Sequence, residues 1–262
     1  MNQYFDIGAN LTHPNFIEDL ELVLNDSLNN GVKKISVTGS NIEESIKAIQ
    51  IAKKWPELLI TTCGIHPHEA KKFNNNTYSE IKDLCKNNEV HSIGETGLDY
   101  HRNYSPKKEQ RVSFENHVEL AIELNMPLFL HVRKAHDDFI SILDNNRNKL
   151  PKVVVHCFTG SKKELKDYIE RNFYIGITGW INDERRGQHL KPLIMDIPLN
   201  RLLIETDAPY LLPRNLGIKH SLRNEPKYLN LIAQEIISNR KEEGKIIIDS
   251  IYRNSELFFG FV

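Results

Sequence analysis

Apolar, mostly β-branched residues recur in short runs about every 30 residues, a spacing typical of strands that alternate with helices. We predict strands over residues 4–10, 33–39, 58–66, 90–95, 127–133, 152–157, 173–179 and 201–207. Because nearly all of these runs are continuously apolar, they favour a parallel sheet whose outer face is covered by helices.

The stretches between the predicted strands have helical spacing, and some carry signals for helix ends. Residues 14–30 predict a helix that ends at Gly31, a residue typical of helix C-termini. Ser105 and Pro106 predict a helix start, with the serine as N-cap and the proline at the first helical position. The last segment, 226–262, predicts two helices that cover the flank of the sheet.

Eight parallel strands alternating with helices predict an α/β fold, the (β/α)8 TIM barrel, and 262 residues suit one such barrel. An open doubly wound sheet is the competing fold, but no G-x-G-x-x-G string follows the first strand. The sequence contains no linker, repeat or low-complexity segment, so we expect a single domain over residues 1–262.

The composition is that of a soluble globular protein, with 40% hydrophobic and 26% charged residues. Three cysteines without a C-x-x-C pair favour a reducing compartment. We find no signal peptide and no apolar stretch long enough to cross a membrane, so we expect a cytoplasmic protein. A formal net charge of -1 neither indicates nor excludes a nucleic-acid partner.

Residues that can bind metal or transfer protons stand at the ends of the predicted strands, where TIM barrels keep their active sites. His131, His156, Glu95 and Asp207 hold equivalent positions on four strands, and together they offer imidazole nitrogens and carboxylate oxygens. A lone histidine at a strand end is usually structural, but four such residues are hard to explain by packing. From chemistry alone Zn, Mn, Fe and Mg all remain open.

Several long strings in the chain resemble the TatD family of metal-dependent deoxyribonucleases, and they are closest to the TatD branch itself. The match runs in order from residue 4 to the end of the chain. The strings are Gly64-Ile65-His66-Pro67-His68, Gly94-Glu95-Thr96-Gly97-Leu98-Asp99, His131-Val132-Arg133, His156-Cys157-Phe158-Thr159-Gly160, Asp183-Glu184-Arg185-Arg186-Gly187 and Glu205-Thr206-Asp207-Ala208-Pro209-Tyr210.

The resemblance implies a TIM barrel of the amidohydrolase type. It also implies a Mg²⁺-dependent exonuclease acting 3′ to 5′ on single-stranded DNA and RNA, with DNA repair or turnover as its setting. Carried over to this chain, the metal and catalytic positions are Glu95, His131, His156 and Asp207. Mn²⁺ and Zn²⁺ remain alternatives to Mg²⁺.

The first strand departs from the wider family, which has D-x-H-x-H where this chain has Asp6-Ile7-Gly8-Ala9-Asn10. Gly8 has no side chain to bind a metal, and Asn10 offers only a neutral carbonyl oxygen. We therefore expect one firmly held ion and at most a weaker second position.

Each candidate has an expected role. Asp207 is the expected general base by analogy with this barrel type, and Glu95 is expected to bind the ion. His66 is expected to donate a hydrogen bond to a phosphate oxygen or leaving group, with a structural role as the alternative. Glu205 is expected to orient a ligand, or else to form a buried ion pair.

Basic and aromatic residues near the predicted strand ends suit a single-stranded polyanion. We expect Arg133, His68, Phe158 and Tyr210 to bind substrate, with Tyr100, Tyr104 and Trp180 as further rings for stacking. Further basic residues expected in these loops are Lys71, Lys72, Arg102, Lys107, Lys108, Lys134, Lys162, Lys163, Arg185, Arg186, Arg214, Lys219 and Arg223.

Two other functions remain open. The same barrel serves small-molecule hydrolases such as lactonases and amidases, although a lysine at the end of the fourth strand would favour them and Glu95 stands there. The other is a nucleic-acid-binding protein without activity, which a missing His131, His156 or Asp207 would favour. In each case we expect a monomer that does not act at a membrane.

Overall fold

The computed structural model describes residues 2–214 and 223–262, so the expected basic residue Lys219 lies outside the described residues. The chain forms two compact units. We call Met1–Val37 with Cys157–Val262 the terminal unit and Thr38–His156 the central unit. The single domain over 1–262 stays a prediction. No helix in the described ranges is long and apolar enough to span a membrane.

The terminal unit contains β1 (Tyr4–Ala9), β2 (Val32–Val37), β7 (Tyr174–Ile177) and β8 (Leu202–Ile204). β1 pairs in parallel with β2, and β7 pairs in parallel with β8. The segment after β8 joins β1, because the Asp207 N–H donates to the Gly8 carbonyl. Strand order in the sheet follows the chain from β1 to β8, as the alternating pattern predicts.

Helices of the terminal unit are α1 (Leu20–Asn29), α6 (Lys162–Ile169), α7 (Leu229–Ser238) and α8 (Gly244–Phe259). The two predicted C-terminal helices are therefore confirmed. α8 packs at the N-terminal ends of the strands: Phe259 stacks on Phe5, and Asn254 donates to the Leu202 carbonyl. The predicted helix over 14–30 is wrong in its first part, where Pro14–Phe16 forms a 3-10 turn.

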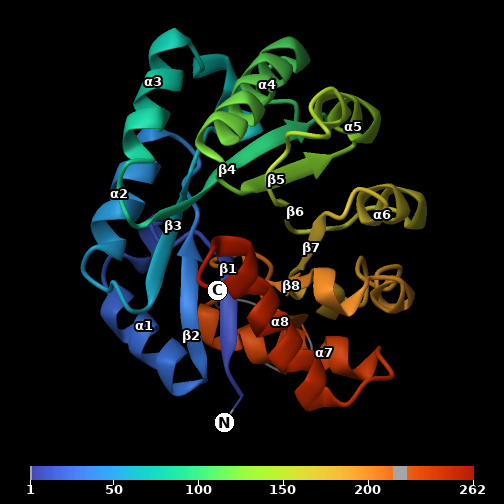
Figure 1. The fold of residues 1–262 in the computed structure, drawn as a ribbon. Helices are drawn as coiled ribbons and strands as arrows, with labels where there is room; N and C mark the ends of the chain where they lie inside the picture. The colour runs from blue at the N-terminus through green and yellow to red at the C-terminus, as the bar shows by residue number, and fades with distance from the viewer. Residues whose placement is uncertain (1, 215–222) are drawn as a thin grey trace. The chain divides into compact units, whose positions relative to one another are not determined.

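The central unit contains β3 (Leu59–Cys63), β4 (Val90–Asp99), β5 (Leu128–Arg133) and β6 (Val153–Val155), all parallel. Its helices are α2 (Ile42–Ala52), α3 (Asn75–Leu84), α4 (Lys107–Leu124) and α5 (His136–Asp144). Figure 1 shows α4 and α5 lying beside β4 and β5. The apolar side chains of these strands are buried, which accounts for their continuous hydrophobic pattern.

Further predicted details differ from the structure, and the following are examples. The N-cap of α4 is Pro106, whereas the Ser105 hydroxyl donates to the His68 carbonyl and accepts from the Lys71 N–H. Ser105 therefore connects the loop before α4 to the segment that contains His68 and Lys71. The predicted strands over 152–157 and 201–207 are too long, because β6 ends at Val155 and β8 ends at Ile204.

Candidate metal centre

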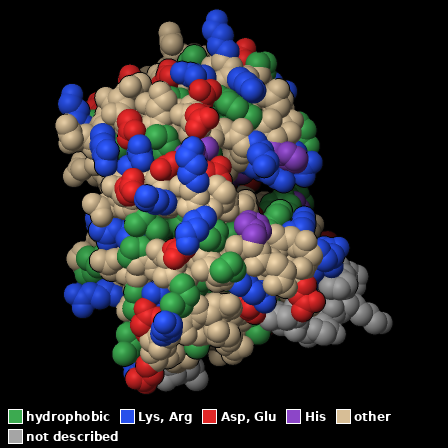
Figure 2. Space-filling model, turned by 90° about the vertical axis from the view of Figure 1, so that its right-hand side faces the viewer, with side chains coloured by type: hydrophobic (Ala, Val, Ile, Leu, Met, Phe, Trp, Pro, Cys, Tyr) green, Lys and Arg blue, Asp and Glu red, His purple; other side chains and the backbone are tan. Residues whose placement is uncertain are grey.

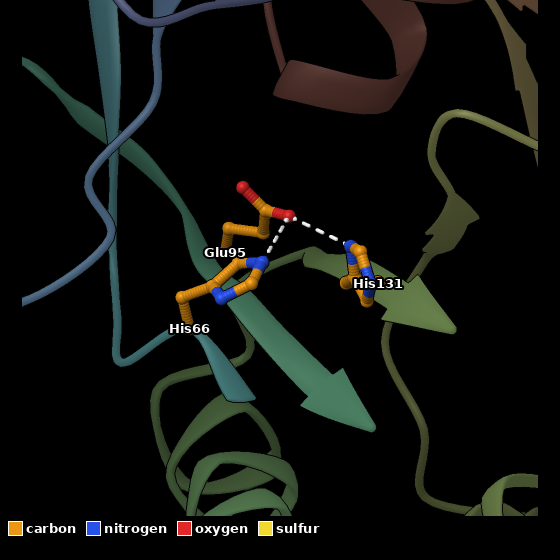
Figure 3. Close-up of side chains that lie close together, drawn as sticks. All are labelled: His66, Glu95 and His131. Atoms are coloured by element: carbon orange, nitrogen blue, oxygen red, sulfur yellow. Dashed lines mark hydrogen bonds and ion pairs between the residues drawn. The ribbon is translucent and has the colours of Figure 1, made fainter. Parts of the chain in front are cut away.

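A single carboxylate oxygen in the central unit faces three imidazoles. Glu95 Oε1 lies 2.8 Å from His156 Nε2, 3.1 Å from His131 Nδ1 and 3.2 Å from His66 Nε2. Figure 3 shows the carboxylate of Glu95 directed toward His66 and His131. The four residues lie on four consecutive strands or within three residues after a strand, but Glu95 lies inside β4 rather than at its predicted end, because β4 continues to Asp99.

A local irregularity in β4 brings Glu95 to this position. The register between β4 and β5 shifts between Ile93 and Thr96. Gly94 has a φ of 148°, and a Cβ there would lie 2.2 Å from the Phe129 carbonyl oxygen. Only glycine fits this close approach, and such a bulge redirects the next side chain.

The Glu95 carboxylate is almost fully buried and stays ionised. Burial alone would raise its pKa, but electrostatic interactions with His156 and His66, with hydrogen bonds from His131 and His156, hold that pKa well below its usual range. Burial would likewise lower the pKa of His131, but hydrogen bonds to Asp99 and Glu95 raise it instead. A buried negative charge surrounded by imidazoles is a strong attractor for a cation.

Asp99 belongs to the same cluster, although the sequence alone assigns it no role. Its Oδ2 lies 2.9 Å from His68 Nε2 and 3.4 Å from His131 Nε2, while Oδ1 accepts from the backbone N–H groups of His101 and Arg102. The sequence signal is its spacing: Asp99 is four residues after Glu95 in one strand, so both lie on the same face.

Hydrogen bonds determine which nitrogen of His66 carries the proton. Its Nδ1 accepts from the backbone N–H of His68, at 3.1 Å. A neutral imidazole with an accepting Nδ1 carries its proton on Nε2, the atom that faces Glu95. The His66 Nε2–H therefore faces Glu95, and the expected donation to a phosphate oxygen or leaving group stays a prediction.

The donor set of this cluster fits a divalent cation. Ligand atoms from His66, Glu95 and His131 all lie within 4.8 Å of one another. Buried imidazole nitrogens beside an ionised carboxylate are the ligands of zinc, manganese and iron sites, and the carboxylate also suits Mg²⁺.

Asp207 lies in the terminal unit, just beyond β8, with a left-handed backbone (φ 55°) that is uncommon for aspartate. Its Oδ1 accepts a hydrogen bond of 2.9 Å from Asn10 Nδ2. The alternation of side chains along β8 does not determine where this carboxylate points, because the strand ends at Ile204. Glu205 accepts from the Cys157 N–H, the residue that follows His156 in the chain.

Asp6, the first residue of the family's first-strand motif, has a different environment. It is fully buried in the terminal unit and accepts from the Gly8 N–H and from the N–H and hydroxyl of Thr206. Burial raises the pKa of Asp6 to about 8. The residue joins β1 to the segment after β8 rather than presenting a charge.

The four residues expected to bind substrate have distinct surroundings. His68 contacts Asp99, and Arg133 ends β5 in register with Asp99. Phe158 is only 3% exposed and packs edge-on against Tyr168, whereas Tyr210 is 51% exposed and packs against His13. Of the two aromatic residues, Tyr210 offers the ring with more accessible surface, and all four roles stay predictions.

Comparisons with known proteins agree with the sequence motifs. The family model for TatD-related DNases matches residues 5–260. The chain is 44% identical over 257 residues to the 3′-5′ ssDNA/RNA exonuclease TatD of Escherichia fergusonii, covering 98% of each. It is 42% identical over 259 residues to the enzyme of that name in Salmonella typhimurium, covering 98% of this chain and 99% of the relative.

Solved structures show the same fold. A TatD homologue from Escherichia coli aligns with a TM-score of 0.90 at 25% identity, and a TatD family hydrolase from Entamoeba histolytica with 0.88 at 28% identity. Each alignment covers 98% of this chain and 98% of the other. With the strand order β1 to β8, these matches confirm the predicted (β/α)8 fold class of the amidohydrolase type.

Proposed function

Because this chain belongs to the TatD family of DNases, we propose that it removes nucleotides stepwise from the 3′ end of single-stranded DNA and RNA by metal-dependent hydrolysis. The structural observation that carries the proposal is the buried, ionised Glu95 carboxylate with three imidazole nitrogens within 3.2 Å. Such a cluster is costly to bury without a cation and is suited to phosphodiester chemistry.

The residues proposed to hold the ion are Glu95, His131, His156 and Asp207. When bound, a divalent cation polarises the scissile phosphate and lowers the pKa of an attacking water. We propose Mg²⁺ or Mn²⁺ as the working ion, with Zn²⁺ as the alternative because nitrogen ligands suit transition metals. One ion is held firmly, and a second position is weak because Gly8 has no side chain to ligate it.

Asp207 is the proposed general base, which takes the proton of the attacking water. Its Oδ1 is oriented by Asn10 Nδ2, at 2.9 Å. Asn10 stands at the last position of the family's D-x-H-x-H string, and in this chain it keeps a role there by positioning Asp207. The substitution of a histidine by asparagine thus exchanges a possible ligand for a hydrogen-bond donor.

His66 is the proposed donor to a phosphate oxygen or to the leaving group, since its Nε2 carries the proton. The segment that follows His66 is fixed by Ser105. The Ser105 hydroxyl accepts from the Lys71 N–H and donates to the His68 carbonyl. Arg133, His68, Phe158 and Tyr210 are the proposed substrate contacts.

The test is a time course on single strands labelled at the 5′ or the 3′ end, with a circular single strand and a blunt duplex alongside. We expect early loss of the 3′ label in the presence of Mg²⁺ or Mn²⁺ and none with EDTA. Rapid cutting of the circle would show an endonuclease. Binding without any release of nucleotides would favour the non-catalytic alternative, and hydrolysis of lactones or amides alone would favour the small-molecule hydrolase.

We also propose that the chain acts as a cytoplasmic monomer, with a single domain over residues 1–262, in DNA repair or turnover. Light scattering of the purified protein tests the oligomeric state, and cell fractionation tests the compartment. A stable dimer or a membrane-bound fraction would contradict these points without affecting the proposed chemistry.

A further inference from the structure

On the face in Figure 2, Lys and Arg side chains are scattered among acidic and apolar ones. Whether a basic residue can bind an anion therefore depends on which acidic groups it is already paired with. In the terminal unit, the loop after β7 and the segment after β8 together place three arginines around one carboxylate. Asp183 is paired with Arg185, Arg186 and Arg214, and we call these four residues the arginine cluster. The carboxylate itself is buried, with 4% of Asp183 exposed.

Arg185 alone is enough to neutralise Asp183. Its Nε lies 3.2 Å from Oδ1 and its Nη2 lies 3.1 Å from Oδ2, which is the two-point geometry of a complete Arg–Asp pair. Arg186 Nε, at 3.1 Å, and Arg214 Nε, at 3.3 Å, then share Oδ2. The four side chains carry a net charge of +2, and the group stays positive even with the exposed Glu184 included.

The guanidinium groups keep free donors on their outer side. The side chain of Arg185 is 58% exposed and that of Arg186 is 52% exposed. Each guanidinium has five N–H donors. The Nη1 atoms of Arg185, Arg186 and Arg214 have no partner among residues 2–214 and 223–262.

The loop holds these donors in place before any ligand arrives. Trp180 Nε1 donates to the Arg186 carbonyl, and the Arg186 guanidinium lies 4.3 Å from the Trp180 ring centroid. Gly187 is needed for this turn, because a Cβ there would lie 2.0 Å from the Trp180 carbonyl oxygen. A preformed site loses less conformational entropy when it binds.

The arginine cluster lies at the end of the strands where TIM barrels bind their substrates. A Cβ on Gly179, which follows β7, would lie 2.2 Å from the Leu211 carbonyl oxygen. The loop after β7 therefore packs against the segment after β8, the segment that begins near Asp207. Both the cluster and the proposed general base thus belong to loops at the carboxyl end of β7 and β8.

Arg223 shows what a purely structural arginine looks like in the same unit. It pairs with both Asp19 and Glu225, and its Nη1 donates to the Asn15 carbonyl. Because two carboxylates neutralise its one guanidinium, Arg223 has no net positive charge available to bind an anion. The arginine cluster has the opposite balance, with three guanidiniums for one carboxylate.

We propose that Arg185, Arg186 and Arg214 bind backbone phosphates of a single-stranded nucleic acid, with Asp183 as the residue that positions all three. The proposal rests on the proposed function and adds to it a specific site for the phosphate track of the substrate. Guanidinium forks match phosphate oxygens in geometry and charge, and such contacts hold a strand without reading its sequence.

The experiment measures binding of a fluorescent oligothymidylate by anisotropy, in EDTA and at several salt concentrations. We expect Arg185→Gln with Arg186→Gln to weaken binding by about tenfold or more, and to reduce the slope of log K against log salt by about 1.4. The matched control is Lys241→Gln with Lys245→Gln, which removes the same charge from residues at and just before the start of α8. The control keeps the parent's affinity and slope.

A variant with Arg185→Lys and Arg186→Lys keeps the charge but loses the guanidinium fork. We expect weaker binding with an unchanged salt slope, and unchanged affinity in this variant would overturn the proposal even if the glutamine variant failed to fold. A folded glutamine variant with the parent's affinity and slope would overturn it as well. Because no metal is present, loss of binding here is separate from loss of nuclease activity, which tests the proposed function.

Discussion

Two of the buried carboxylates, Glu95 and Asp6, have completely different surroundings. Glu95 in the central unit faces imidazole nitrogens of His66, His131 and His156, and its pKa lies well below the usual range. Asp6 in the terminal unit faces the hydroxyl of Thr206 and two backbone N–H groups, and burial raises its pKa to about 8.

The difference shows that burial alone does not identify a metal ligand. Desolvation acts on both residues and favours the protonated form in each case. At Glu95 nearby imidazoles reverse that effect, so the carboxylate stays charged and ready for a cation. At Asp6 hydrogen bonds lower the pKa only in part, so the acid is largely neutral at pH 7 and connects β1 to the segment after β8.

The largest expected effect concerns Asp207, which is half-buried and accepts a hydrogen bond from Asn10 Nδ2. We expect Asp207→Asn to lower the hydrolysis rate by about 100- to 10,000-fold, because the amide keeps the shape but cannot accept a proton. Substrate binding and thermal stability should persist. The measurement is single-turnover release of 3′ nucleotides at saturating metal, and near-normal turnover would remove Asp207 from the role of general base.

The next prediction tests the charged character of the Glu95 cluster. EDTA should abolish nuclease activity, and added Mn²⁺ or Mg²⁺ should restore that activity. Because His131 and His156 are proposed ligands, replacing either by alanine should raise the metal concentration needed by about 10- to 100-fold or abolish rescue. Isothermal titration of the metal into each variant gives a second readout that does not depend on activity.

His101→Ala is the matched control for these histidine variants. His101 is an exposed histidine of the central unit, and its described contact is made by its backbone N–H. This variant should need no more metal than the parent. Full activity of the parent in metal-free buffer would contradict the metal hypothesis outright.

The sequence predicts much of the Glu95 cluster because strand ends are readable: apolar runs place His131, His156 and Glu95 on successive strands. It does not predict the partners of Asp6 or Asp99, since those depend on which backbone groups the loops bring near. Asp99 could have been found from its even spacing from Glu95 in β4, had that strand been predicted to its full length.

Boundaries were predicted less well than the elements themselves, for a physical reason. Asp207 and Cys157 have left-handed backbones that no apolar pattern reveals. Phe158 follows directly and turns inward against Tyr168, so an aromatic residue that the sequence assigns to substrate contributes to packing. Serine is typical of helix N-caps, but the Ser105 hydroxyl instead donates to the His68 carbonyl in another loop.

A third prediction concerns the pH dependence of stability, which should come from Asp6 and not from Glu95. The folded chain holds the Asp6 proton more tightly than the unfolded chain, where the pKa is near 3.8. Stability from this residue is therefore present at low pH and is lost as the pH rises from about 4 to about 8, by a few kcal/mol in total.

Asp6→Asn should remove this dependence, because asparagine resembles the protonated acid in shape and charge. The measurement is urea unfolding of parent and variant at pH 5, 7 and 8.5. We expect the variant to gain stability relative to the parent as the pH rises. A constant difference between the two across this range would show that Asp6 is ionised in the folded chain.

The smallest expected effect concerns Asn10, which links the terminal unit's strand β1 to Asp207 through a single hydrogen bond of 2.9 Å. If Asn10 positions the base without binding the ion, Asn10→Ala should lower the hydrolysis rate by about tenfold, the value of one hydrogen bond to a charged group. The metal concentration for half-maximal activity should not change. Asn10→His restores a ring nitrogen at the family's position, and a lower metal requirement in that variant would show that a second ion can bind there. An Asn10→Ala variant that needs more metal than the parent would instead make Asn10 a ligand, and the proposed positioning role would be wrong.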